Sequence, residues 1–288
     1  MVAFLSCDGS KELPIPNTEN PKTYEIKMNL GGEYVETSES PLSRTETPKK
    51  YYGVNVYCKK DDGTTNSYYH YAYGIFDNIE DMKITLLGGY KYKFECTSIQ
   101  DGEDKIEINK THNGPFSSYS TEINKFTISS YNYLDDIQVG GISVETYGYF
   151  SYPRTNRYYG ELEDYIPTDN DKATISMKRT VFGINMKVNA IPDGELFWSL
   201  DRELFLKNHS HTGNDIIEFS SIYTFYDVYE SWKNDNYTTN FTFYFTWERS
   251  NGFKQSFSKT ISVKRNVMTN VNVTLEGGSG EVSLGINE

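Results

Sequence analysis

Carboxylate and imidazole side chains are the groups in this sequence with the most obvious capacity for chemistry. Glu161, Glu163 and Asp164 lie together in the segment GELEDY. A glycosidase needs two carboxyl groups held about 5–9 Å apart across a cleft, and sequence spacing alone does not establish such a separation. His209 and His211 would lie on one face of a strand and could bind a metal ion. Their surroundings, NHSHTGND, are typical of a solvated loop and offer no evident third ligand, so we expect no metal site.

Two other acidic stretches, Asp61-Asp62-Gly63 and Asp169-Asn170-Asp171, are typical of turns in which Asp and Asn bond to their own backbone. Neither has the full spacing of an EF-hand calcium loop. The sequence also lacks a phosphate-binding loop, a dinucleotide-binding glycine motif, a nucleophile elbow and a zinc-protease HExxH motif. We therefore expect no catalytic residues, no cofactor and no enzymatic activity.

Cys7 follows the short apolar run MVAFLS, and this start resembles a bacterial lipobox, in which the cysteine is lipidated and becomes the mature N-terminus. The run is too short for a complete secretory signal, so we interpret residues 1–22 as a signal-peptide remnant with a lipobox and a flexible tether. A lipid on Cys7 would anchor the protein to a membrane without spanning it. The alternative is an unstructured terminus with a chance cysteine.

The other two cysteines, Cys58 and Cys96, each lie within a predicted strand. In an exported protein they could form a disulfide. The interpretation we favour is two separate, partly buried thiols, since a free cysteine often behaves as a small hydrophobic residue.

Tyrosine is unusually abundant, with 25 residues. Its rigid, amphipathic ring suits recognition surfaces and also stacks on sugars. The interpretation we favour is structural, with tyrosines paired across neighbouring strands. The residues concerned form two groups, the first of Tyr51, Tyr52, Tyr57, Tyr68, Tyr69, Tyr71 and Tyr73 and the second of Tyr147, Tyr149, Tyr152, Tyr158 and Tyr159.

The overall composition excludes several classes of protein. The 288 residues carry 28 Lys and Arg against 40 Asp and Glu, a net charge of −12. This acidic balance argues against a nucleic-acid partner and against electrostatic docking to an anionic membrane. No stretch of about 18 apolar residues is present, so no transmembrane helix is expected. The aromatic content of 15% excludes a disordered chain and favours β-sheet.

Alternation of apolar and polar residues predicts strands along most of the chain. In the clearest case, Phe241, Phe243, Phe245 and Trp247 share one face, and Ser250-Asn251-Gly252 supplies a hairpin turn. Helical patterns are few, and the segment 223–233 is compatible with either a short helix or a strand. We predict an all-β protein of two antiparallel β-sandwich domains. With the polar stretch 167–171 as the boundary, these comprise residues 23–170 and 171–288.

Several segments carry a resemblance to a known family, the fimbrillin superfamily of the Bacteroidetes, which contains type V pilins and cell adhesion lipoproteins. The segments are TYEIKMNLGGEY at 23–34, PLSRTET at 41–47, YYGVNVY at 51–57, YAYGIFDN at 71–78, ATISMKRTVFGINMKV at 173–188, with Arg179 between two strands, and VKRNVMTNVNVTL at 263–275.

The resemblance implies two transthyretin-like β-sandwich domains, no enzymatic activity, export, lipidation at Cys7 and display at the outer membrane, in a fimbrium if the protein polymerises. Shaft pilins of this family polymerise by strand exchange, in which a trypsin-like protease cuts after an Arg near the N-terminus and removes the first strand, and a C-terminal strand of the next subunit fills the groove. The implied cleavage position is Arg44, and the implied donor strand contains Val271, Val273 and Leu275. Partners would be other pilus subunits or a host or bacterial surface receptor. Arg44 could equally be an ordinary loop residue, and the donor segment could be the last strand of its own domain.

A second function remains open at this stage. A surface lipoprotein that binds glycans for a polysaccharide uptake system would share the fold and the abundant tyrosines, and fold-level resemblance does not separate the two. An enzyme such as a glycosidase receives little support from the motifs.

Overall fold

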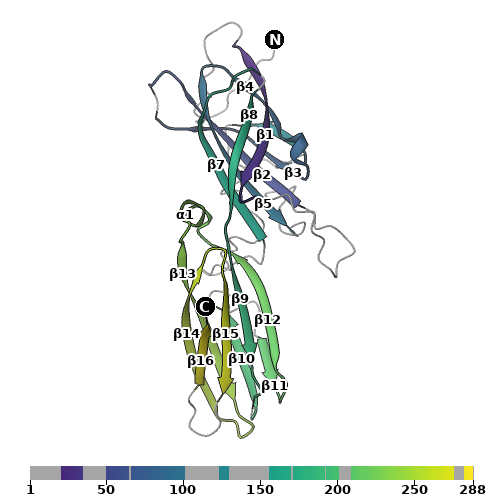
Figure 1. Ribbon diagram of the computed structural model, residues 1–288, viewed down its shortest axis with the longest axis vertical. Coiled ribbons are helices and arrows are strands. Elements are labelled where there is room, and N and C mark those ends of the chain that lie inside the picture. The colour runs from purple at the N-terminus through teal and green to yellow at the C-terminus, as the bar shows by residue number, and fades with distance from the viewer. Residues whose placement is uncertain are drawn as a thin grey trace, which may run out of the picture. The chain divides into compact units, whose positions relative to one another are not determined.

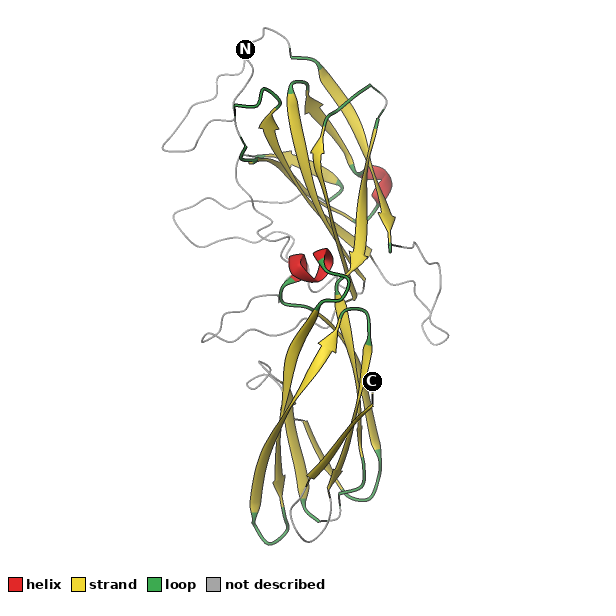
Figure 2. Ribbon diagram, turned by 60° about the vertical axis from the view of Figure 1, so that its left-hand side comes forward, coloured by secondary structure: helices red, strands yellow, loops and turns green. Residues whose placement is uncertain are grey.

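The computed structural model describes residues 21–34, 50–64, 66–100, 123–129, 156–169, 171–191, 193–200, 209–275 and 282–287. Strands dominate these ranges, as Figures 1 and 2 show, which confirms the predicted all-β class. The described ranges contain a single α-helix, and none of their helices is long and apolar enough to cross a membrane.

The described residues divide into two compact units. Unit 1 contains those up to residue 129 together with Tyr158–Lys178, and unit 2 contains residues 156 and 157 and those from Arg179 onward. The domain boundary expected at residue 170 stays a prediction, and in this division the following strand up to Lys178 groups with unit 1.

Unit 1 is built on one eight-stranded sheet in the order β4-β1-β8-β7-β5-β2-β3-β6. A short 3-10 helix, η1 (Ile79–Asp81), precedes β4 and is capped by the side chain of Asn78. The strands are β1 (Thr23–Gly32), β2 (Lys50–Lys60), β3 (Tyr69–Phe76), β4 (Lys83–Leu87), β5 (Tyr90–Gln100), β6 (Lys125–Ile128), β7 (Asn156–Tyr165) and β8 (Lys172–Arg179).

This sheet curls around one core. Its two edge strands, β4 and β6, contact each other although they lie at opposite ends of the strand order. The Tyr71 hydroxyl on β3 donates a hydrogen bond of 2.9 Å to the Thr85 carbonyl on β4. Apolar side chains from β1, β2, β3, β4, β5 and β8 meet in a single buried cluster. Curling therefore allows one sheet to bury its own apolar face.

Unit 2 is a sandwich of two four-stranded sheets, β11-β10-β13-β14 and β12-β9-β15-β16. Side chains of both sheets share one core, as expected for face-to-face packing. The elements are β9 (Val181–Val188), β10 (Glu195–Leu200), β11 (His209–Thr212), β12 (Ile217–Thr224), α1 (Val228–Lys233), β13 (Thr238–Glu248), β14 (Lys254–Lys264), β15 (Met268–Leu275) and β16 (Val282–Asn287).

The predicted hairpin near the C-terminus is confirmed. β13 and β14 pair antiparallel along their whole length, and Gly252 in the turn adopts φ +82°. Phe241, Phe243, Phe245 and Trp247 are all buried. The outward-facing hydroxyls of Thr242 on β13 and Thr260 on β14 lie 3.0 Å apart, so the exposed face is stabilised by cross-strand polar pairs.

Two features differ from the prediction. Each unit contains a parallel strand pair, β1 with β8 and β9 with β15, which the prediction of antiparallel sandwich domains did not include. Alternation marks which residues face inward and carries no information on the direction of the neighbouring strand. The segment around His209 and His211, expected to be a loop, forms strand β11 at a sheet edge. The segment 223–233 contains both the end of β12 and the short helix α1.

We predict that Gly194→Ala destabilises unit 2 by more than about 2 kcal/mol, measured by chemical denaturation. Gly194 has φ +81°, and a Cβ at this position would lie 1.9 Å from the Glu248 carbonyl oxygen on β13. β10 would have to move away from β13. The matched control is Gly213→Ala, which has φ +89° and open space around it, and should cost only about 1 kcal/mol of backbone strain. Equal losses from the two variants would contradict the close contact between these strands.

Candidate functional site

The first strand of unit 1 lies between two other strands, and this position makes it a candidate site of assembly. Residues 23–27 of β1 pair antiparallel with β4, and residues 27–32 pair parallel with β8. Figure 1 shows β1 alongside β8. In the strand order of the described sheet, β4 is an edge strand and β1 is its neighbour. β1 thus joins β4 to the rest of the unit.

β1 contributes its side chains to the core and its backbone to the sheet. Ile26 and Met28 are both 0% exposed. Gly32 ends the strand with φ +76°, and a Cβ there would lie 2.6 Å from the Met177 carbonyl oxygen on β8. The backbone N–H of Glu33 then donates to that carbonyl at 2.8 Å. Glycine is therefore required for the close approach of β1 and β8 at this end.

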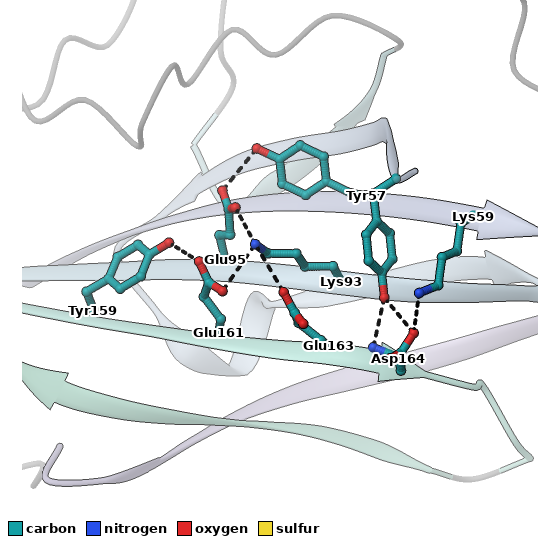
Figure 3. A network of polar contacts seen from close by, with 9 residues as sticks. Tyr57, Lys59, Lys93, Glu95, Tyr159, Glu161, Glu163 and Asp164 are labelled. Atoms are coloured by element: carbon teal, nitrogen blue, oxygen red, sulfur yellow. Dashed lines mark hydrogen bonds and ion pairs between the residues drawn. The ribbon is translucent and has the colours of Figure 1, made fainter. Parts of the chain in front are cut away.

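A network of charged and tyrosine side chains covers strands β2, β5 and β7 on the sheet face opposite the core (Figure 3). The Lys93 ammonium lies 3.1 Å from a carboxylate oxygen of Glu95, 3.1 Å from one of Glu161 and 3.5 Å from one of Glu163. Only 4% of the Glu161 side chain and 17% of the Lys93 side chain are exposed. A lysine on β5 thus joins its own strand to two carboxylates of β7.

Tyrosine hydroxyls donate hydrogen bonds to two of these carboxylates. Tyr57 donates to Glu95 at 2.9 Å, and Tyr159 donates to Glu161 at 2.6 Å. Figure 3 shows the two tyrosines approaching from β2 and β7. Buried carboxylates are tolerated when each is paired and hydrogen bonded in this way.

At the end of β7 a second ion pair adjoins this network. Lys59 lies 2.5 Å from the Asp164 carboxylate, which also accepts a hydrogen bond of 2.9 Å from the Tyr68 hydroxyl. The Tyr68 hydroxyl accepts in turn from the Asp164 backbone N–H at 3.0 Å. Asp164 adopts φ +55°, and these contacts hold it in that left-handed conformation.

The electrostatics of the network follow from burial and pairing. Burial raises the pKa of Glu161 above its ordinary value, although Tyr159 and Lys93 act in the opposite direction. Burial lowers the pKa of Lys93, but the charges and hydrogen bonds of Glu95 and Glu161 outweigh this effect and leave its pKa raised. The raised pKa favours the charged form of Lys93, and its contacts with Glu161 and Glu163 tie β5 to β7.

The residues that the sequence analysis assigned to lipidation, cleavage and strand donation lie in different parts of the chain. Cys7 and Arg44 fall outside the described residues. The proposed donor residues, Val271, Val273 and Leu275, lie on β15 and are buried in the core of unit 2. β15 is flanked by β9 and β16, so it forms an interior strand of its sheet.

Cys58 and Cys96 are both free and buried. Cys58 is opposite Tyr92 and Cys96 is opposite Val54 in the pairing of β2 with β5. The two cysteines are thus four residues out of register, about 13 Å along the strands, which is too far for a disulfide. Burial raises the pKa of the Cys58 thiol to about 12. Of the two interpretations left open by the sequence, buried thiols is the one that the structure supports.

The candidate metal ligands are not brought together, whereas the candidate carboxylates Glu161 and Glu163 both lie beside Lys93 in the network described above. His211 bonds to the carbonyl of Asp215 at 2.8 Å and is 9% exposed. In the ranges that the structure describes, no three His, Cys, Asp or Glu side chains converge as metal ligands would. Asp62 accepts from the backbone N–H of Thr64 at 2.9 Å, the turn bonding expected for that stretch.

Most of the described tyrosines of the first group are packed within unit 1. Tyr51, Tyr52, Tyr71 and Tyr73 are all buried, and the rings of Tyr71 and Tyr92 meet edge to face at 5.5 Å. Tyr147, Tyr149 and Tyr152 lie outside the described residues. Sequence reasoning missed the pairing of Lys93 with Glu161. The only available signal was the alternation of charges in both segments, which does not identify partner strands.

Comparison with known proteins gives matches of structure alone. No protein-family model matches the chain, and no curated protein matches it. One similar structure is the fimbrial anchor protein Mfa2 from Porphyromonas gingivalis, with 11% identity and a TM-score of 0.38, covering 93% of this chain and 98% of that chain. Another is a fimbrial assembly protein from Parabacteroides distasonis, with 12% identity and a TM-score of 0.33, covering 93% and 100%.

A third similar structure, from Bacteroides thetaiotaomicron, is provisionally named a polysaccharide-binding protein. Its identity is 10% and its TM-score 0.34, with 82% of this chain and 87% of that chain covered. At TM-scores below 0.5 the matches assign neither an activity nor a partner to this chain.

We predict that Lys93→Met lowers the free energy of unfolding by about 3 kcal/mol at pH 8, because it leaves the buried Glu161 carboxylate without its cation. Loss of the cation raises the pKa of Glu161 further in the folded state. The folded protein then takes up a proton as the pH falls from 8, so the difference from wild type should narrow towards the ordinary glutamate pKa of 4.5.

Lys254→Met is the matched control for this prediction. It removes a pair of 2.8 Å with Glu248 in which the side chains are 62% and 38% exposed, and it should cost less than about 1 kcal/mol. Denaturant unfolding of both variants across this pH range measures the effect. If the loss in Lys93→Met were as small as in the control, or did not change with pH, the network would not stabilise the sheet.

Proposed function

We propose that this chain is a non-enzymatic surface protein of the fimbrillin type, which joins other pilus subunits or a surface receptor through β-strand complementation. The observation that carries the proposal is the position of β1, which pairs with β4 along one half and β8 along the other. Removal of β1 would leave unpaired backbone on both strands and a gap where Ile26 and Met28 were. An incoming strand would pair with the unpaired backbone and fill the gap in the core.

The proposed release step is cleavage after Arg44, in the connection between β1 and β2. The leading segment would leave together with a lipid on Cys7. In the uncut form the same lipid would hold the protein at the outer membrane. The two forms correspond to a polymerising subunit and to a retained anchor or adhesin.

The donor strand is proposed to come from the C-terminal end of another subunit. Val271, Val273 and Leu275 have the required alternation, but release of β15 would open the core of unit 2. β16 follows it at the sheet edge and carries the alternating residues Val282, Leu284 and Ile286. An edge strand can leave without breaking pairing on two sides, so we propose β16 as the more accessible donor.

The proposed modifications are tested by intact mass and N-terminal sequencing of the protein from its native membrane. We expect either a chain that starts at acylated Cys7 and retains Arg44, or a chain that starts at Thr45. The first form would be an anchor or adhesin, and the second a subunit that has lost β1. An unmodified chain that still carries Met1 would contradict export and lipidation.

The proposed strand exchange is tested with a variant in which residues 41–47 are replaced by the site of a sequence-specific protease. After cleavage and removal of the β1 peptide, we expect the protein to bind a labelled peptide of residues 281–288, measured by fluorescence anisotropy. Uncleaved protein and a Leu284→Glu peptide are the controls and should not bind. Binding of the β1 peptide alone would refute β16 as donor, and binding of neither peptide would refute an exchangeable slot.

A further inference from the structure

Unit 1 contains a polar pocket that the assembly function does not use. Its volume is about 300 Å³, which is within the range of small-molecule sites. It lies where the end of β1, the start of β2 and the turn after β3 meet, and all of its walls belong to unit 1. Its lining residues are Asn29, Leu30, Tyr34, Tyr52, Asp77, Asn78, Ile79 and Glu80.

The inner wall of the pocket is formed by two tyrosines. Tyr52 is 2% exposed and Tyr34 is 8% exposed, and their hydroxyl oxygens lie 2.7 Å apart. The Tyr34 ring also meets Tyr158 edge to face at 5.4 Å. These contacts fix both rings, so a ligand would meet a rigid aromatic surface with hydroxyl groups that can donate and accept hydrogen bonds.

The outer wall presents amide and carboxylate groups that neighbouring residues hold in place. The Asp77 carboxylate accepts a hydrogen bond of 2.6 Å from the Asn124 amide. Glu80 forms an ion pair with Lys27, and this contact lowers the pKa of the Glu80 carboxyl. Asn29, at the end of β1, is exposed and completes the wall.

The polar and apolar groups of these walls fit a hydroxyl-rich ring. Lys27 balances the charge of Glu80, and the Asp77 carboxylate accepts a hydrogen bond from the neutral Asn124 amide, so both carboxylates are held as hydrogen-bond acceptors. Planar amide and carboxylate groups can hydrogen bond to adjacent hydroxyl groups of a sugar. Leu30 and Ile79 offer an apolar surface for the C–H face of its ring. We propose that this pocket binds one pyranose residue of a glycan, with Tyr52 and Asn29 among its direct contacts.

The pocket depends on β1 because Asn29 and Leu30 lie on that strand and Tyr34 is the second residue after it. If β1 is removed as proposed above, sugar binding would be lost with it. Only this dependence rests on the proposed function. Sugar binding by the uncut chain stands or fails without strand exchange.

The test is saturation-transfer NMR on the uncut full chain with four probes: the methyl glycosides of glucose, galactose and mannose, and N-acetylglucosamine. We expect saturable binding of at least one probe, weakened at least tenfold in Asn29→Ala and in Tyr52→Phe. Asn240→Ala, an exposed asparagine on strand β13 of unit 2, is the matched control and should bind as wild type.

Thermal unfolding of each variant separates loss of binding from loss of fold, and Asn29→Ala is expected to be stable because its side chain is exposed. Absence of binding by all four probes to folded wild type at tens of millimolar would overturn the proposal. Binding that persists in Asn29→Ala would also overturn it, since the sugar would then be held elsewhere. Neither result would bear on the binding of strand peptides by the cleaved protein.

Discussion

The pairing of β1 with two strands is the constraint on which unit 1 depends. Backbone N–H and C=O groups in a protein interior need partners, and β1 supplies them first to β4 and then to β8. Its side chains Ile26 and Met28 also complete the core that the curled sheet encloses. One strand near the start of the described chain therefore closes both the sheet and the apolar interior.

β1 also contributes residues to the polar pocket of unit 1. Its end forms part of the pocket beside Tyr34 and Tyr52, while the strands across the sheet carry the Lys93 network on their outward face. Both places combine tyrosine hydroxyls with carboxylates. In the network the lysine and tyrosines satisfy Glu161, which is nearly buried, so its role is structural. In the pocket the polar groups surround open space, where a ligand can meet them.

Unit 2 buries its apolar side chains between two sheets, whereas unit 1 buries them within one curled sheet. Aromatic side chains of β13 interlock with residues of β9 and β15 across the core, and the rings of Phe182 and Phe241 lie 5.6 Å apart. The parallel pairing of β15 with β9 makes β15 an interior strand, and β16 covers its other edge. β16 is the edge strand of this sheet, so its departure would leave the pairing of β15 with β9 intact.

Local features of this protein were determined by the sequence alone. The alternation in β13 predicted which side chains are buried, because the period of two belongs to the extended backbone itself. The Asn251-Gly252 turn was equally local, since it depends on the positive φ of one residue. The tertiary structure decided which strands are neighbours. Many alternating strands are compatible with one another, so the parallel partners of β1 and β15, the register that separates Cys58 from Cys96, and the walls of the pocket all required long-range packing.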